Sequence, residues 1–203
     1  MLKYLVGIFV TACLAVPLNA AGSAKQELIL RLQQLQSFTA DFEQVVSDAQ
    51  ANVMHQASGS IALAQPDNLR WHTTEPDEIM LIADGESVYQ IDYFVEQISI
   101  VNQSDAINSN PMMLLTSTDP LDWEDFTVSR VDSGYQITGQ QQASIISLEL
   151  IFENDLLSII RSVDSQEQQS QLTFSEQIEN GQLSAEMFQP NLPAEFIIDD
   201  QRQ

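Results

Sequence analysis

Short segments in which apolar and polar residues alternate are the feature of this 203-residue chain that most constrains its fold. Phe38, Ala40 and Phe42 are separated by polar residues, and the same period of two recurs at 60–64, 89–95, 146–152 and 172–174. Because successive side chains of a strand point to opposite faces, each run predicts a β-strand with one apolar face.

Turn-forming residues separate these runs. They are Asp84–Gly85, Asp132–Gly134, Glu153–Asp155 and Asn180–Gly181. Tight turns between short strands are typical of an antiparallel meander, and the runs predict one sheet of about ten strands.

Two segments have helical signals instead. Ser23 and Gln26 resemble a capping box ahead of a leucine stripe at helical spacing, which predicts an amphipathic helix over 24–36. Asn110 before Pro111 predicts the start of a short apolar helix over 111–116. We therefore expect one mainly β domain over 21–203, a curved sheet whose apolar face is covered by short helices.

The first 20 residues have the organisation of a secretory signal peptide. Lys3 precedes an apolar stretch from Leu5 to Val16, and the small residue Ala20 follows shortly after Pro17. A stretch of about a dozen apolar residues is shorter than the roughly 20 that a membrane-spanning helix needs. We expect residues 1–20 to be removed and the mature, exported chain to begin near Ala21.

Cys13, the one cysteine of the chain, allows a second interpretation. Val10 to Cys13 resembles the lipobox after which bacterial lipoproteins are cut and acylated. A cut before Cys13 would leave only about seven apolar residues after Lys3, which is short for a signal. The ordinary signal peptide is therefore the preferred prediction, and it leaves a mature chain without thiol chemistry.

The charge is strongly acidic, with 29 acidic residues against 7 basic ones. Such a surface repels nucleic acid and anionic membranes, so we expect no nucleic-acid partner. Simple solubility and the avoidance of bilayer surfaces both account for this charge.

Catalytic and metal-binding motifs are absent from the sequence. His55 and His72 belong to no motif, and there is no nucleophile elbow, phosphate loop, HExxH sequence or cysteine-based metal site. Carboxylate pairs such as Asp122 with Glu124 arise by chance among 29 acids. We predict no catalytic residue, no metal and no cofactor. An exported lipid hydrolase is the alternative from another class, because catalytic triads are adjacent in space rather than in sequence.

Taken together, short motifs along nearly all of the mature chain resemble the LolA family, the outer-membrane lipoprotein carrier proteins. They are Phe38–Gln44, Gly59, Pro66, Arg70–Trp71, Pro76–Glu78, Ala83–Gly85, Phe94–Gln97, Pro111–Leu114, Asp122–Trp123, Met187–Pro190 and Asp199–Arg202. The resemblance implies an unclosed antiparallel β-barrel with a helical lid over a hydrophobic cavity.

The same resemblance implies a function and partners. A family member is a monomeric periplasmic chaperone that takes lipoproteins, bound by their acyl chains, from the inner-membrane LolCDE transporter to the outer-membrane receptor LolB, without catalysis or metal. The alternative on the same fold is a lipid- or lipoprotein-binding receptor or sensor that does not shuttle.

Alternation restricts which apolar residues are candidates for the lipid-binding cavity, although each of them is also suited to ordinary core packing. On the strands the candidates are Ile61, Leu63, Leu69, Trp71, Met80, Ile82, Tyr89, Ile91, Tyr93, Ile98 and Ile100. On the lid they are Leu28, Leu32, Leu35, Met112, Met113 and Leu115.

One position departs from the family pattern. Many LolA proteins have an arginine directly before the proline that matches Pro66, and this arginine bonds to the lid backbone to keep the empty cavity closed. Here the position is Gln65, which shares strand parity with Ile61 and Leu63 and should still point toward the lid. A neutral amide contributes about 0.5–1.5 kcal/mol per hydrogen bond against about 1.5–3 for a charged donor. We therefore expect a weaker latch.

Overall fold

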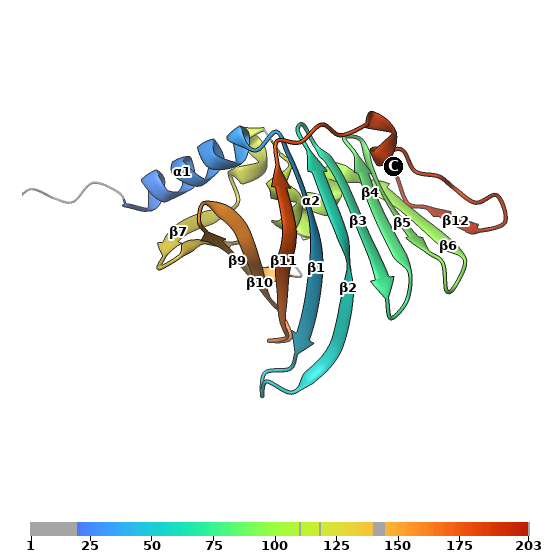
Figure 1. Cartoon of the computed structure of the whole chain (residues 1–203), viewed down its shortest axis with the longest axis horizontal. Helices are drawn as coiled ribbons and strands as arrows, with labels where there is room; N and C mark the ends of the chain where they lie inside the picture. The colour runs from blue at the N-terminus through green and yellow to red at the C-terminus, as the bar shows by residue number, and fades with distance from the viewer. Residues whose placement is uncertain (1–19, 110, 118, 140–144, 203) are drawn as a thin grey trace, which may run out of the picture.

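Twelve strands form one curved sheet in the computed structural model, which describes residues 20–109, 111–117, 119–139 and 145–202 (Figure 1). The strands are β1 Ser37–Ser47, β2 Val53–Ala64, β3 Asn68–Glu75, β4 Ile79–Asp84, β5 Ser87–Asp92, β6 Gln97–Asn102, β7 Thr127–Val131, β8 Gly134–Thr138, β9 Ile145–Glu153, β10 Leu156–Asp164, β11 Gln169–Glu179 and β12 Ile197–Asp200. The helices are α1 Ala20–Gln34, α2 Gln103–Ser109 and the 3-10 helices η1 Pro111–Leu115, η2 Pro120–Trp123 and η3 Ala185–Phe188.

The strand order is β12-β6-β5-β4-β3-β2-β1-β11-β10-β9-β8-β7. Neighbours pair antiparallel except β12, which runs parallel to β6. Two meanders, β1–β6 and β7–β11, thus meet where β1 pairs with β11. The predicted mainly β, unclosed antiparallel sheet is confirmed, with twelve strands rather than about ten.

The sheet bends most visibly along the long β1–β2 hairpin. The register of β2 and β3 shifts between Ser58 and Gly59. A Cβ atom built on Gly59 would lie 1.9 Å from the carbonyl oxygen of His72. Only glycine permits this approach, because any side chain would meet the β3 backbone. Gly59 therefore allows the two strands to stay paired through the bulge.

Two segments, α1 and residues 103–117, cover the concave face of the sheet, and we call them the lid. Figure 1 shows α1 crossing above β7 and α2 lying inside the curve. Leu28 and Leu32 of α1 and Leu114 of η1 are buried in one apolar core with Phe38 and Phe174 of the sheet. The predicted cover of helices on the apolar face is confirmed.

Details of the predicted helices were wrong. Ser23 lies inside α1 and not at its start, because Ala20 and Ala21, the best helix formers, extend the helix toward the N-terminus. The segment after Pro111 is a 3-10 helix, and α2 directly before it was not predicted. Asn110, the expected N-cap, lies outside the described residues, as do Cys13 and residues 1–19 of the expected signal peptide. Among the helices of the described residues, none is long and apolar enough to cross a membrane.

A second, smaller core lies on the opposite, convex face of β4, β5 and β6. It comprises Met80, Ile82, Ile91, Ile98 and Ile100, with Tyr89, Tyr93, Leu192 and Phe196 packed against them. The chain that follows β11 covers this face, since Phe196 makes an edge contact with Tyr93 at a centroid distance of 5.6 Å. The β4–β6 half of the sheet is therefore apolar on both faces.

Candidate functional site

A cleft of about 400 Å³ lies on the concave face, between β1, β3–β5 and β10–β11. Buried Leu69, Met113 and Leu172 form its deep end, next to half-buried Trp71 and Leu81. Trp71 is fixed in place, because its ring centroid lies 4.6 Å from that of Phe42, with the rings tilted by 44°, and its Nε1 donates to Thr73 Oγ1 at 3.1 Å. The deep end is thus lined only by apolar side chains and one constrained indole.

The other end of the cleft is polar. The polar side chains of the lining lie toward it, beside Val46 and Ile79; they are Gln44, Thr73, Gln90, Ser162, Asp164, Gln168 and Ser170. Gln44 Nε2 donates to Ser170 Oγ at 2.7 Å, which adds a side-chain bond between the paired strands β1 and β11. These residues lie toward the sheet end that carries the β3–β4 and β10–β11 turns (Figure 1). An amphiphile with its chains inward and its polar part at this end would match both linings.

The structure brings some of the predicted cavity residues together on this face. Leu69, Trp71 and Met113 line the cleft. The others belong to the adjoining core or pack against it; they are Leu28, Leu32, Leu35, Ile61, Leu63 and Leu115. Met112 lies in η1, but its side chain is outside the described part of the structure.

Seven predicted residues lie on the face of the sheet opposite this cleft. Met80, Ile82, Tyr89, Ile91, Tyr93, Ile98 and Ile100 all belong to the convex core. Their cross-strand partners show the reason: Trp71 pairs with Leu81, whereas Met80 pairs with His72. Since residues 79–83 are apolar at every position, alternation does not specify which set points inward.

Several lining residues were missed. Ile79 and Leu81 occupy the concave positions of β4, and Val46 and Leu172 come from β1 and β11. Pairing Leu81 with Trp71 and then with Gln90 would have identified the concave residues of β4, but the register is not visible in the sequence. No sequence pattern indicates that Gln44, Ser162 and Ser170 line the cleft.

The lid meets the β2–β3 turn through Gln65. Its Nε2 donates to the carbonyl oxygen of Leu115 at 3.4 Å, and its Oε1 is buried without a partner. The expectation that Gln65 points toward the lid is therefore confirmed, and its single bond is long. Asp67 adds a shorter link, because its N–H donates to the Thr116 carbonyl at 3.1 Å.

Gln103 of α2 strengthens the same junction, although no sequence pattern predicts this role. Its Nε2 donates to the Asp67 carbonyl at 2.8 Å, and its Oε1 accepts from the Gly85 N–H at 3.0 Å. Burial raises the pKa of Asp67, with a smaller contribution from the nearby charges of Asp122 and Asp119. The junction therefore contains both attractive bonds and a concentration of negative charge.

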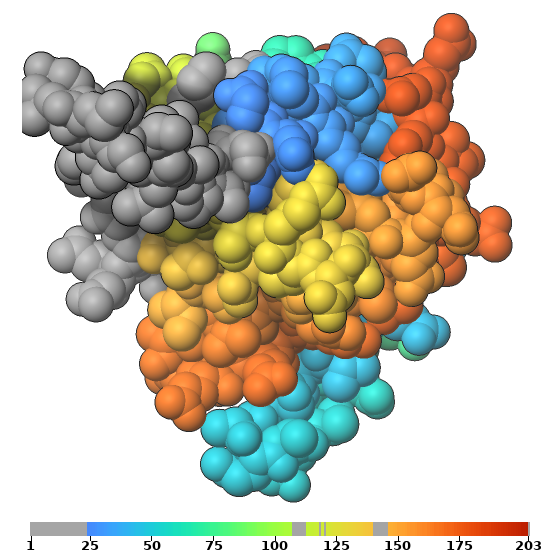
Figure 2. Space-filling view, turned by 90° about the vertical axis from the view of Figure 1, so that its left-hand side faces the viewer, coloured from blue at the N-terminus to red at the C-terminus, as the bar shows by residue number. Residues whose placement is uncertain are grey.

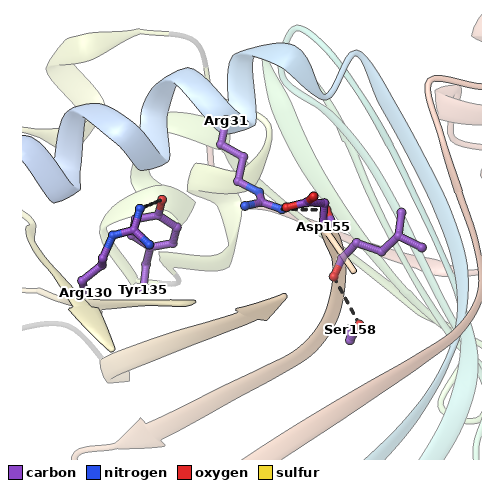
Figure 3. Close-up of polar contacts among 6 residues, drawn as sticks. Arg31, Arg130, Tyr135, Asp155 and Ser158 are labelled. Carbon is purple, nitrogen blue, oxygen red and sulfur yellow. Dashed lines mark hydrogen bonds and ion pairs between the residues drawn. The ribbon is translucent and has the colours of Figure 1, made fainter. Parts of the chain in front are cut away.

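A second cleft, of about 490 Å³, lies beneath α1. Figure 2 shows α1 lying over the β7–β10 strands on this side, with the β1–β2 hairpin projecting below. Arg31 donates to the Asp155 carbonyl at 2.6 Å, and Arg130 donates to the Tyr135 hydroxyl at 3.3 Å (Figure 3). Arg31 also stacks over Phe152, and Arg130 donates to Glu27 at 2.6 Å.

These ion pairs join α1 to the edge of the sheet. The Glu27 hydrogen bond raises the pKa of Arg130, which keeps this arginine charged. Because charged pairs occupy the cleft beneath α1, the cleft around Trp71 is the better candidate for apolar ligands. Among the described residues, no group of His, Cys, Asp or Glu is arranged to hold a metal ion.

Several known proteins are similar to this chain in sequence. Residues 33–191 match the family model described as outer membrane lipoprotein carrier protein LolA. The outer-membrane lipoprotein carrier protein of Idiomarina loihiensis is 37% identical over 179 residues, covering 88% of both chains. The protein of that name from Shewanella loihica is 35% identical over 193 residues, covering 93% of both chains.

Solved structures show the same fold at much lower identity. A LolA superfamily protein from Nitrosomonas europaea superposes with a TM-score of 0.52 at 12% identity, over 81% of this chain and 97% of that one. MucB gives 0.51 at 13% identity, over 89% of this chain and 66% of MucB. The match to the family model and the identity to its members are decisive: the chain belongs to the LolA family of outer-membrane lipoprotein carrier proteins.

Proposed function

We propose that this protein is a periplasmic carrier that binds the acyl chains of lipoproteins in the cleft around Trp71 and delivers them to the outer membrane. The observation that supports this most is the lining of the cleft, which is apolar at the deep end beneath Met113 and polar toward the other end. Carriage of this kind is a binding function and involves no catalysis.

Free energy explains why such a cleft is needed. Each buried methylene contributes about 0.8 kcal/mol. Transfer of an anchor of two or three long chains from the membrane into water therefore costs on the order of tens of kcal/mol. A sealed core is already filled with its own side chains, whereas a cleft under a movable lid can accept the chains and release them.

The size of the cleft implies that the lid moves. Pockets for single small ligands measure about 300–1,000 Å³, and this cleft of about 400 Å³ is at the lower end of that range. An anchor with several chains needs more room. Displacing Met113 and Leu115 would join the cleft to the adjoining core beneath α1, where Leu28 and Leu32 are buried.

The transport route belongs to the same proposal. We infer that residues 1–20 direct export, that the mature chain works as a periplasmic monomer, and that it receives cargo from LolCDE and delivers it to LolB. The names of the relatives support carriage rather than the non-shuttling receptor or sensor.

Native mass spectrometry after co-expression with a lipoprotein tests the proposal. The wild type should be isolated with triacylated lipoprotein bound. Leu81→Glu should lose it at least tenfold, because an ionised carboxylate in an apolar site costs several kcal/mol. Ile178→Glu is the control, since Ile178 is exposed on β11 away from the cleft lining. Equal cargo on all three proteins would contradict binding in this cleft.

A further inference from the structure

The two segments of the lid are attached to the rest of the molecule in different ways. Lys25 of α1 is half-buried, and its Nζ donates to the carbonyl oxygens of Trp123 and of Phe126, the latter at 3.0 Å. These carbonyls lie at the end of η2 and directly before β7. The ammonium group therefore joins α1 to the edge of the sheet through two charged hydrogen bonds, which are stronger than neutral ones.

Two further anchors follow along α1. Glu27 accepts from Arg130 of β7 at 2.6 and 3.2 Å, and Arg31 donates to the carbonyl oxygen of Asp155 in the β9–β10 turn at 2.6 Å. Figure 3 shows Arg31 reaching down from α1 to this turn. One exposed ion pair contributes little stability, but these anchors act together with Lys25 on one helix. Because they are spread along α1, the helix cannot swing about one of them while the others are kept.

The apolar side of α1 is packed against the core. Leu28 and Leu32 are buried there with Phe38 and Phe174. None of the described residues that line the cleft around Trp71 comes from α1. Moving α1 would therefore break packing and ion pairs without uncovering this cleft.

The second segment of the lid, residues 103–117, borders the cleft directly. Met113 lies at its deep end. The bond from Gln65 Nε2 to the Leu115 carbonyl is long, at 3.4 Å, and Gln65 Oε1 is buried without a partner. The junction also concentrates negative charge around Asp67. Displacement of this segment would uncover the cleft and would break bonds that are long or opposed by charge.

We propose that α1 is a fixed wall of the cavity and that residues 103–117 alone move when acyl chains enter. This inference rests on the proposed carrier function, because the acyl chains are the ligand for which the lid opens. The chains pass beneath Met113 and Leu115 into the core under α1. There α1 stays in place, and its anchors to β7 and to the β9–β10 turn keep that side of the core closed to water.

Paired cysteines test this division in the mature chain over 21–203, which contains no cysteine of its own. Glu27→Cys/Arg130→Cys places thiols at two partly exposed positions, and a short bismaleimide that bridges them fixes α1 to β7. Asp67→Cys/Thr116→Cys uses two residues joined by a backbone hydrogen bond of 3.1 Å, so that oxidation fixes the second segment with a disulfide.

Triacylated lipoprotein in detergent is added after crosslinking, and bound cargo is measured by native mass spectrometry. The bridged α1 variant should bind cargo as the wild type does. The oxidised Asp67→Cys/Thr116→Cys variant should bind about tenfold less or weaker still, because its binding-competent open state is no longer populated. Reduction of the disulfide should restore binding, which shows that the variant is folded.

The wild type keeps the two proposals apart. Wild-type protein without cargo would contradict the carrier function. Wild-type protein with cargo, together with a bridged α1 variant that has lost it, would overturn the fixed wall alone. Unchanged binding by the oxidised Asp67→Cys/Thr116→Cys variant would overturn the movement of residues 103–117.

A second measurement needs no crosslink. Glu27→Gln/Arg130→Gln removes one anchor of α1, and the matched control Glu149→Gln/Arg161→Gln removes an ion pair of 3.3 Å between β9 and β10. An environment-sensitive apolar dye should bind more to the first variant, because a loosened α1 exposes part of the core. The control should bind dye as the wild type does. Equal dye binding by the two variants would show that the Glu27–Arg130 pair does not hold α1 in place.

Discussion

At the scale of single residues, Gln65 has the clearest consequence. Its one bond to the lid is 3.4 Å long and its Oε1 is buried without a partner, which costs about 1–3 kcal/mol. Gln65→Arg should remove this cost and supply charged donors to the Leu115 carbonyl. The closed empty state should then gain about tenfold in population.

Binding of an environment-sensitive apolar dye measures that population. The wild type should bind more dye than Gln65→Arg. The wild type should also release cargo to the receptor more slowly than Gln65→Arg, because it recovers less free energy when the lid closes again. Gln34→Arg is the control for the added charge, because Gln34 is exposed at the end of α1. Equal dye binding by Gln65→Arg and the wild type would show that this side chain does not hold the lid.

Gly59 gives a second residue-scale prediction. Gly59→Ala places a methyl group 1.9 Å from the His72 carbonyl oxygen, so β2 and β3 must separate at the bulge. Overpacking of this kind costs about 1–3 kcal/mol, which should appear as a lower midpoint of urea unfolding. Gly181→Ala is the control, since its nearest neighbour is the movable Ile178 Cγ2 at 3.2 Å. Equal midpoints for the two variants would contradict the tight approach of the strands.

At the scale of elements, the lid junction should respond to pH. The folded-state pKa of Asp67 is raised by burial and by the Asp122 and Asp119 charges, so its ionised form is disfavoured in the folded protein. Asp67→Asn should therefore raise the thermal midpoint at pH 7. The part of this gain that comes from the Asp67 charge should disappear as pH falls through the raised pKa toward the ordinary value of 3.8, where the aspartate is protonated in both states.

The dependence on pH is the decisive part of that measurement. Asp67 has a φ of 62°, a conformation that Asn tolerates at least as well as Asp, so some gain is independent of pH. Asp132→Asn, in the exposed β7–β8 turn, serves as control. A gain that is the same at pH 7 and below pH 3.8 would show that the Asp67 charge does not weaken the junction.

The elements also show where sequence reasoning succeeded and where it failed. Runs such as 38–43 alternate cleanly, so their strands and apolar face could be predicted. Residues 79–83 are apolar throughout and lie between two cores, one under the lid and one under the chain around Phe196. Only the register with Trp71 identifies Leu81 as the residue that points inward. Contacts between distant segments, such as Gln103 with Asp67, leave no local pattern to read.

At the scale of the whole molecule, the two faces of the sheet have different roles. The concave face carries the cleft and the lid, while the convex face of β4–β6 is closed by the C-terminal chain. The central claim is that acyl chains enter the concave side. Cargo binding would then depend on Leu81 and Trp71, and the convex residues Ile91 and Ile98 would contribute stability alone.

Photo-crosslinking from the cargo tests this claim most directly. A lipoprotein whose acyl chains carry a diazirine would be loaded onto the wild-type protein, irradiated, and the adducts located by peptide mass spectrometry. Adducts should concentrate on Leu69, Trp71, Leu81 and Met113 of the concave cleft. Adducts on Met80, Ile91 or Ile98 of the convex core, or on the exposed Phe94 of the β5–β6 turn, would contradict the assignment of the acyl-chain site.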